Sequence, residues 1–302
     1  MLCERNKVVM NQEQLIDQCA NKDTCGFFLK ILIVLAVILI TAVTCGKIVR
    51  AETPSLKISI LFNNVSYKEN LKTSWGFSCL IEGMDQTILF DTGGDGNILL
   101  SNMRQMGIDP GVVEVVVLSH IHADHIGGLE SFLEKNPNVV VCLPESFPAT
   151  FKQAVRNRGA KVEEIHEPKY LFEGVYTTGE MGDWIKEQSL VLTTSKGLVI
   201  ITGCAHPGVV NIVRKARGHF KADVYMVMGG FHLLSMSDSE IQKIIHMLKE
   251  LGVQKVAPSH CTGDLARTMF RKTWGNDFIE SGIGAVIELS RQVGKSTLLD
   301  KN

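Results

Sequence analysis

The 302-residue sequence lacks an excess of charge of either sign, with 31 lysines and arginines against 32 aspartates and glutamates. A protein that binds nucleic acid through its phosphates needs a basic surplus, so this balance argues against a nucleic-acid partner. Cysteine is also sparse, at eight residues, which excludes a disulfide-stapled scaffold. The sequence has no repeats of solenoid period and no low-complexity linker. With 45% hydrophobic residues, the composition is that of an ordinary globular protein.

One long hydrophobic run stands apart, at residues 27–45 (FFLKILIVLAVILITAVTC), and only Lys30 interrupts it. Its length matches the roughly 20 residues that cross a bilayer. We therefore predict an N-terminal hydrophobic helix at about 27–45, within a signal or anchor segment at 1–51. Cleavage after Ala51 would export the rest of the chain, whereas an uncleaved helix would anchor it in the membrane. A cytoplasm-facing anchor stays open, because basic residues lie on both sides of the run.

Residues 52–302 are predicted to form one domain of mixed strands and helices. Apolar runs within 77–90 predict an early hairpin, and Val112–Leu118 predicts a buried strand. Ser237 and Glu240 have the spacing of a capping box, which predicts a helix start there. Early hairpins followed by strands that alternate with helices indicate α/β layers with mixed sheets.

The candidate chemistry lies in the histidines, three of which fall within the segment HIHADH at 120–125. Imidazole binds zinc, iron and manganese, and a carboxylate adds a preference for harder divalent ions. Four ligand-type side chains in six residues cannot all face one ion. They can divide between two adjacent ions, His120 with His122 on one and Asp124 with His125 on the other.

Three further histidines follow later apolar segments, namely His206, His232 and His260. Sites in α/β proteins form at the carboxyl ends of strands. Since each of these histidines follows a predicted strand in the same sense, we expect them to gather with the HIHADH segment at one rim.

These motifs resemble the metallo-β-lactamase superfamily. Four other segments narrow the resemblance to the branch of 7,8-dihydropterin-6-methyl-4-(β-D-ribofuranosyl)-aminobenzene-5′-phosphate synthases. They are FDTG at 90–93, ITGCAHPGVVNI at 201–212, GGFHL at 229–233 and PSHCTGD at 258–264.

The resemblance implies an αββα sandwich with a metal centre at one edge. It implies two divalent ions, with zinc as the first expectation and iron or manganese as alternatives. By motif, the first ion would be held by His120, His122 and His206, and the second by Asp124, His125 and His260.

Many superfamily members also carry a bridging aspartate on the strand before the last histidine. This sequence has no aspartate there, in YMVMGGFHLL at 225–234, and His232 is the nearest candidate. His232 could be a metal ligand, or a catalytic acid or donor toward substrate. Asp91 is expected to support the metal-binding loop through hydrogen bonds. Cys204 and Cys261 are expected to be packing residues, with a ligand or redox role as the alternative.

We therefore predict a metal-dependent hydrolase that acts on a small-molecule ester, lactone or phosphoester, for which a phosphorylated substrate is one option. Water held by the ions would attack, and Asp124 would orient it and accept its proton. One alternative is the transfer that the branch name implies, which joins a dihydropterin methyl pyrophosphate to a ribofuranosylaminobenzene phosphate. The other is a membrane-anchored metal-binding domain without catalysis.

Overall fold

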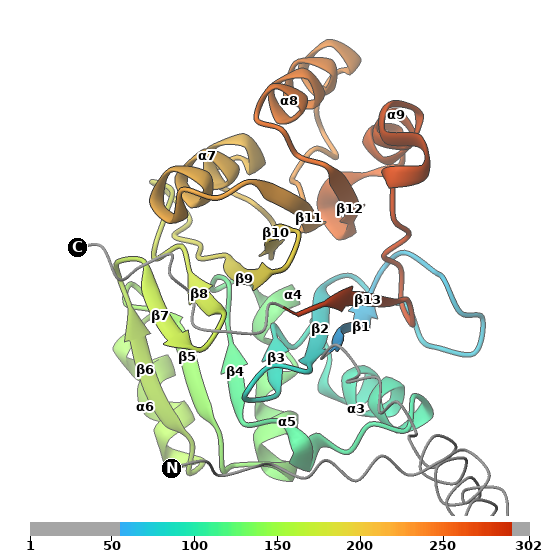
Figure 1. Ribbon diagram of the computed structural model, residues 1–302. Helices are drawn as coiled ribbons and strands as arrows, with labels where there is room; N and C mark the ends of the chain where they lie inside the picture. The colour runs from blue at the N-terminus through green and yellow to red at the C-terminus, as the bar shows by residue number, and fades with distance from the viewer. Residues whose placement is uncertain (1–54, 292–302) are drawn as a thin grey trace, which may run out of the picture. The chain divides into compact units, whose positions relative to one another are not determined.

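The computed structural model describes residues 55–291, whose strands form two sheets (Figure 1). The predicted hydrophobic helix at 27–45, with the rest of the predicted signal or anchor segment at 1–51, lies outside the described residues. Within 55–291, no helix has the length and apolar character needed to cross a membrane.

The first sheet has seven strands in the order β13-β1-β2-β3-β4-β5-β6. β1, β2 and β3 pair antiparallel, as does β13 with β1, whereas β3 to β6 run parallel. The strands are β1 (Ser55–Asn63), β2 (Phe77–Glu82), β3 (Ile88–Phe90), β4 (Val115–Val117), β5 (Val140–Pro144), β6 (Lys161–Ile165) and β13 (Val286–Ser290).

The second sheet has six strands in the order β12-β11-β10-β9-β8-β7. β10, β11 and β12 are parallel neighbours, so their carboxyl ends lie at one edge of the sheet. The strands are β7 (Lys169–Phe172), β8 (Val175–Thr177), β9 (Leu190–Thr194), β10 (Gly197–Thr202), β11 (Val224–Gly230) and β12 (Lys255–Ser259).

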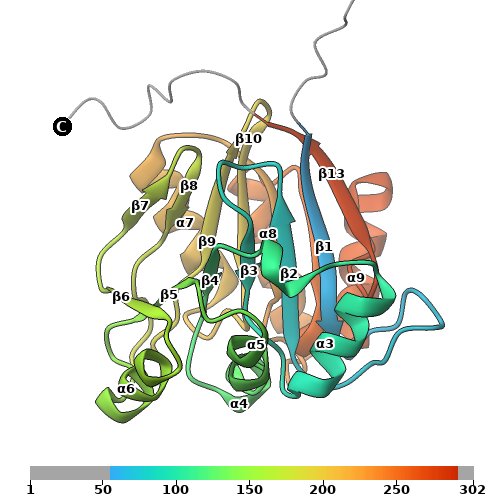
Figure 2. The same cartoon turned by 90° about the horizontal axis from the view of Figure 1, so that it is seen from below.

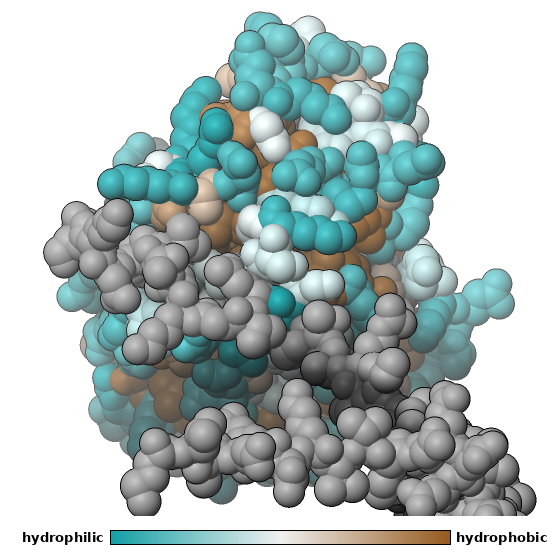
Figure 3. Space-filling view, in the orientation of Figure 1, coloured by the Kyte–Doolittle hydropathy of each residue, from teal (hydrophilic) through white to brown (hydrophobic). Residues whose placement is uncertain are grey.

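Helices cover the outer face of each sheet, which gives the predicted αββα layers (Figure 2). On the first sheet lie α3 (Gly96–Gln105), α4 (Ala123–Ile126), α5 (Leu129–Lys135) and α6 (Ala149–Asn157). On the second lie α7 (Val209–Phe220), α8 (Asp238–Glu250) and α9 (Asp264–Trp274). Short 3-10 turns occur at Pro110–Val112, His260–Thr262 and Gly275–Asp277. Hydrophilic residues cover most of the outer surface over α7 to α9, with apolar residues visible between them (Figure 3).

The continuous apolar runs follow from burial on both sides of each sheet. In β10, Val199 and Ile201 face the core between the sheets, whereas Leu198 and Ile200 pack under the outer helices. A strand covered on both faces needs no polar alternation. The predicted capping box at Ser237 is confirmed, with Glu240 accepting from the Ser237 backbone N–H at 2.8 Å.

The sequence interpretation missed β6, β7 and β8. β6 reads KVEEI and has one fully buried residue, and β7 begins with two exposed residues. Both are edge strands, where one side faces solvent and the apolar signal is weak. The predicted strand at Val112–Leu118 is also shorter than expected, because a 3-10 turn after Asp109 occupies its first residue.

Candidate metal centre

The first candidate ligand group joins the loop after β4 to the loop after β10. His120 Nε2 lies 3.1 Å from His122 Nδ1, and the His206 ring centre lies 4.8 Å from the centres of both rings. The Nε2 atom of His206 is buried and has no hydrogen-bond partner among residues 55–291. The structure thus brings these three imidazole rings together.

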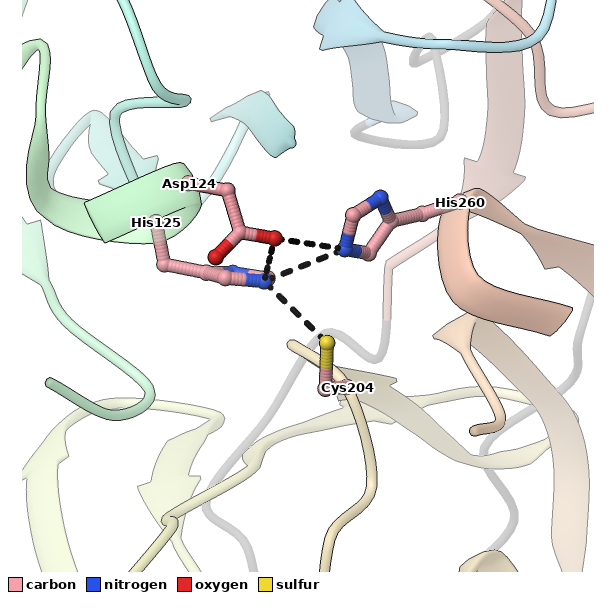
Figure 4. Close-up of side chains that lie close together, drawn as sticks. All are labelled: Asp124, His125, Cys204 and His260. Carbon is pink, nitrogen blue, oxygen red and sulfur yellow. Dashed lines mark hydrogen bonds and ion pairs between the residues drawn. The ribbon is translucent and has the colours of Figure 1, made fainter. Parts of the chain in front are cut away.

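The second group lies beside it and combines Asp124 and His125 of α4 with His260 after β12 (Figure 4). Asp124 Oδ2 lies 3.2 Å from His260 Nε2 and 3.5 Å from His125 Nε2. The two imidazole Nε2 atoms are 3.3 Å apart. The short helix α4 aims its two side chains at a histidine that is 135 residues away in the sequence.

The chemistry of these groups fits divalent cations. Burial is the largest cause that lowers the pKa of His120, His122 and His206, in the last case to about 4. Neutral imidazoles are the metal-binding form of histidine. The buried, unpartnered Nε2 of His206 would be costly in an apolar setting without a ligand. The residues present therefore suit two adjacent metal positions.

Asp91, which the sequence nominated as a supporting residue, lies fully buried behind the histidines. Its Oδ2 lies 2.7 Å from His125 Nδ1, and its carboxylate also accepts from the Ser119 backbone N–H and hydroxyl at 2.7 Å. The Ser119 hydroxyl in turn lies 2.9 Å from His120 Nδ1. One carboxylate thus orients a histidine in each group, the arrangement that fixes the orientation of metal-binding imidazoles. Asp91 adopts a φ of 53°, a strained conformation held by these bonds.

Glu187 is a site residue that sequence reasoning missed. Its buried carboxylate accepts from four consecutive backbone N–H groups, those of Gly203, Cys204, Ala205 and His206, at 2.8 to 3.2 Å. Burial raises its pKa to about 7, although these N–H donors lower it. Glu187 therefore shapes the loop that carries His206. It sits in a polar loop without a recognisable motif, so no signal in the sequence marked it.

Asn64 was missed for the same reason. Its side-chain Oδ1 lies 2.9 Å from His260 Nδ1, across 196 residues of sequence. This contact leaves Nε2 of His260 directed at Asp124 and His125.

No carboxylate can take the bridging position from β11, because its last residue is Gly230. A Cβ atom there would lie 2.5 Å from the Gly203 carbonyl oxygen and 2.7 Å from Cys261 Sγ. His232 is exposed, and its ring centre lies 4.4 Å from that of His206. It stands outside both metal groups, at the mouth of the site.

A cavity of about 240 Å³ adjoins His206 and His232, between α7 and α8. Ile244 and Met247 form part of an apolar wall, and Asn211 and Arg214 add polar groups. Pockets that combine apolar walls with a few polar groups are typical of small-molecule sites.

The two metal positions are expected to differ in their response to acid. Burial lowers the pKa of His125, but the charge and hydrogen bond of Asp91, together with the charges of Asp124 and Glu187, outweigh it and leave the pKa raised. A raised pKa keeps this imidazole protonated to higher pH, and a protonated imidazole cannot bind metal. The position at His125 should therefore empty first on acidification, while the three lowered-pKa histidines keep their ion.

Elemental analysis of protein equilibrated between about pH 8 and pH 5 should show a fall from about two equivalents to about one. The ion remaining at low pH should be lost in a His206→Ala variant and kept in a His260→Ala variant. If the ion were kept in His206→Ala and lost in His260→Ala, the assignment of the two positions would be wrong.

The chain is thus an α/β protein of four layers, whose candidate metal ligands cluster at the strand ends of its two sheets. Residues 76–214 match a family model described as the metallo-beta-lactamase superfamily, and the chain belongs to that superfamily. A curated relative is 31% identical over 289 residues, covering 78% of this chain and 98% of the relative. It is the 7,8-dihydropterin-6-methyl-4-(beta-D-ribofuranosyl)-aminobenzene-5'-phosphate synthase of Methanocaldococcus jannaschii.

A solved structure, Tm1679, described as a metal-dependent hydrolase of the beta-lactamase superfamily, is 30% identical with a TM-score of 0.67. The match covers 78% of this chain and 99% of that one. An uncharacterised M. jannaschii protein is 29% identical, covering 76% of this chain and 99% of the relative. The resemblance seen in the motifs thus extends over nearly the whole length of these proteins.

Proposed function

We propose that this chain is a metal-dependent transferase of the kind named by its synthase relative. It would join a dihydropterin methyl pyrophosphate to a phosphorylated ribofuranosylaminobenzene and release pyrophosphate. The observation that carries this proposal is the pairing of the two ligand groups with the cavity beside His206 and His232. A flat ring could rest on the apolar wall while an anionic group reaches the metal positions and Arg214.

Divalent ions held by His120, His122 and His206 and by Asp124, His125 and His260 would neutralise the charge of the leaving pyrophosphate. Burial raises the pKa of Asp124, but the hydrogen bond to His260 and the charges of His125 and His260 together outweigh it and lower the pKa to about 2. Its side chain is 21% exposed, so it can face an incoming nucleophile and position it.

Hydrolysis is the second candidate, favoured by the description of the 30% identical solved structure. In that case Asp124 would orient a water in place of the acceptor and take its proton.

The test is an assay of the full chain with the dihydropterin methyl pyrophosphate, with and without the arylamine acceptor. Pyrophosphate release that depends on the acceptor, and that stops on chelation and returns with metal, supports the transferase. Acceptor-independent release, or turnover of phosphodiester and ester substrates, supports hydrolysis instead. A metal-loaded protein with no turnover in any assay overturns both.

His232 is expected to act on substrate rather than on metal. Its hydrogen bond with Cys261 is the largest cause that raises its pKa, which favours the donor form of the ring near neutral pH. A His232→Gln variant should keep its full metal content and lose about 100-fold in kcat, the usual scale of a lost general acid. Loss of metal in this variant would make His232 a ligand instead.

A further inference from the structure

Cys204 lies where the two candidate metal groups meet. Its Sγ is 3.2 Å from His125 Nε2 (Figure 4). The ligand atoms of Asp124, His125, Cys204 and His260 all lie within 4.8 Å of one another, and so do those of His120, Cys204 and His206. Among residues 55–291, Cys204 is the side chain that these two groups share.

The backbone holds the sulfur in this position. The N–H groups of Gly203, Cys204 and Ala205 all donate to Glu187 Oε1. Ala205 has a φ of 61°, so the turn after Cys204 is a strained one that these bonds maintain. A Cβ at Gly230 would lie only 3.2 Å from the Cys204 Cα. Glycine at the end of β11 therefore lets the two backbones pack closely, and no side chain of Gly230 competes with Cys204 for this space.

The two ligand groups also carry little negative charge, so an additional anionic ligand between them would help to neutralise two divalent cations. His120, His122 and His206 are three neutral side chains, and the second group contains a single carboxylate, Asp124. A thiolate is a strong ligand for zinc and for other thiophilic ions. A thiolate between the two positions would give negative charge to both.

We propose that the Cys204 thiolate is a ligand shared by the two metal positions, taking the bridging place for which this chain has no aspartate. The inference rests on the proposed metal-dependent function. It also selects a thiophilic metal, zinc or iron, over manganese.

Cys261 provides a matched control. It is equally buried, and its Sγ lies 3.6 Å from the Cys204 carbonyl oxygen. It groups with Cys204 and His232 but with neither set of three proposed ligands. A Cys261→Ser change should therefore leave both metal positions intact.

The test uses the full chain, stripped of metal, kept reduced and reloaded with cobalt(II). Wild type and Cys261→Ser should show near-ultraviolet thiolate-to-cobalt charge transfer at the two-ion stoichiometry. Cys204→Ser and Cys204→Ala should lose that band, keep the visible bands of imidazole-bound cobalt, and bind metal about 100-fold more weakly. Cysteines outside residues 55–291 are the same in every variant, so they cannot produce the difference.

X-ray absorption of the zinc-loaded wild type, which needs no variant to fold, should show a zinc–sulfur distance of about 2.3 Å. Three results would overturn Cys204 as a shared ligand and leave the proposed function standing. Wild type could bind cobalt without a charge-transfer band, zinc could show no sulfur scattering, or the charge-transfer band could persist in Cys204→Ser. A wild type that binds neither metal would overturn both.

Discussion

Replacing His206 with Ala is expected to remove one of the two proposed metal ions and to lower kcat about 1,000-fold. The His206 ring lies beside the rings of His120 and His122, and its buried Nε2 has no hydrogen-bond partner among residues 55–291. His120, His122 and the shared Cys204 would then have to hold that ion without its third imidazole. Losing the charge that stabilises a leaving group typically costs a factor of this size.

Elemental analysis and steady-state kinetics on the same preparation check this expectation. His246→Ala is the matched control, because His246 lies exposed on α8 and, among residues 55–291, pairs only with Glu250, at 3.2 Å. It should keep both ions and full activity. If His206→Ala kept two equivalents of metal, the first ligand group would be wrongly assigned.

Replacing Glu187 with Ala is expected to lower the free energy of unfolding by about 3–5 kcal/mol, the cost of breaking a buried charged network. Four backbone N–H groups lose their acceptor at once, and each buried donor left without a partner is costly. The loop that carries Cys204 and His206 would then lose its fixed shape, so metal affinity should fall as well.

Denaturant unfolding in the presence of a chelator separates this structural loss from lost metal. Glu187→Gln keeps one carbonyl acceptor and should lose less stability. Glu250→Ala, on the exposed end of α8, should stay within about 0.5 kcal/mol of wild type. A Glu187→Ala protein as stable as wild type would show that water replaces the carboxylate, and the loop would not depend on it.

The fold could be predicted where one local pattern decided it. Strands covered on both faces appear as unbroken apolar runs, as in β10 and β11, and the capping box marked the start of α8. The edge strands β6 and β7 carry charged and exposed residues, so their pairing depends on neighbours and not on their own composition. Their place in the sheets was therefore invisible before the tertiary structure was known.

The residues of the candidate site likewise fall into those that a sequence motif marked and those that only the structure revealed. Histidines and an aspartate at fixed spacing identify metal chemistry, because few other functions need those residue types so close together. Cys204 was expected to be a packing residue, with a ligand or redox role as the alternative. It is buried, and its Sγ lies 3.2 Å from His125 Nε2, a proximity that only the folded chain reveals. Glu187 and Asn64 have no motif at all, and each acts on residues that only folding brings near.

The sequence by itself determined the layered α/β class, and it predicted the candidate ligand types and their division into two groups, because these depend on local spacing and on apolar periodicity. The tertiary structure decided which buried carboxylate holds the His206 loop, which sulfur lies between the two groups, and why β11 ends in a glycine at the site. These features depend on distances between residues far apart in the chain. Buried hydrogen-bonding groups must find their partners there, and close packing leaves room for one side chain and not another.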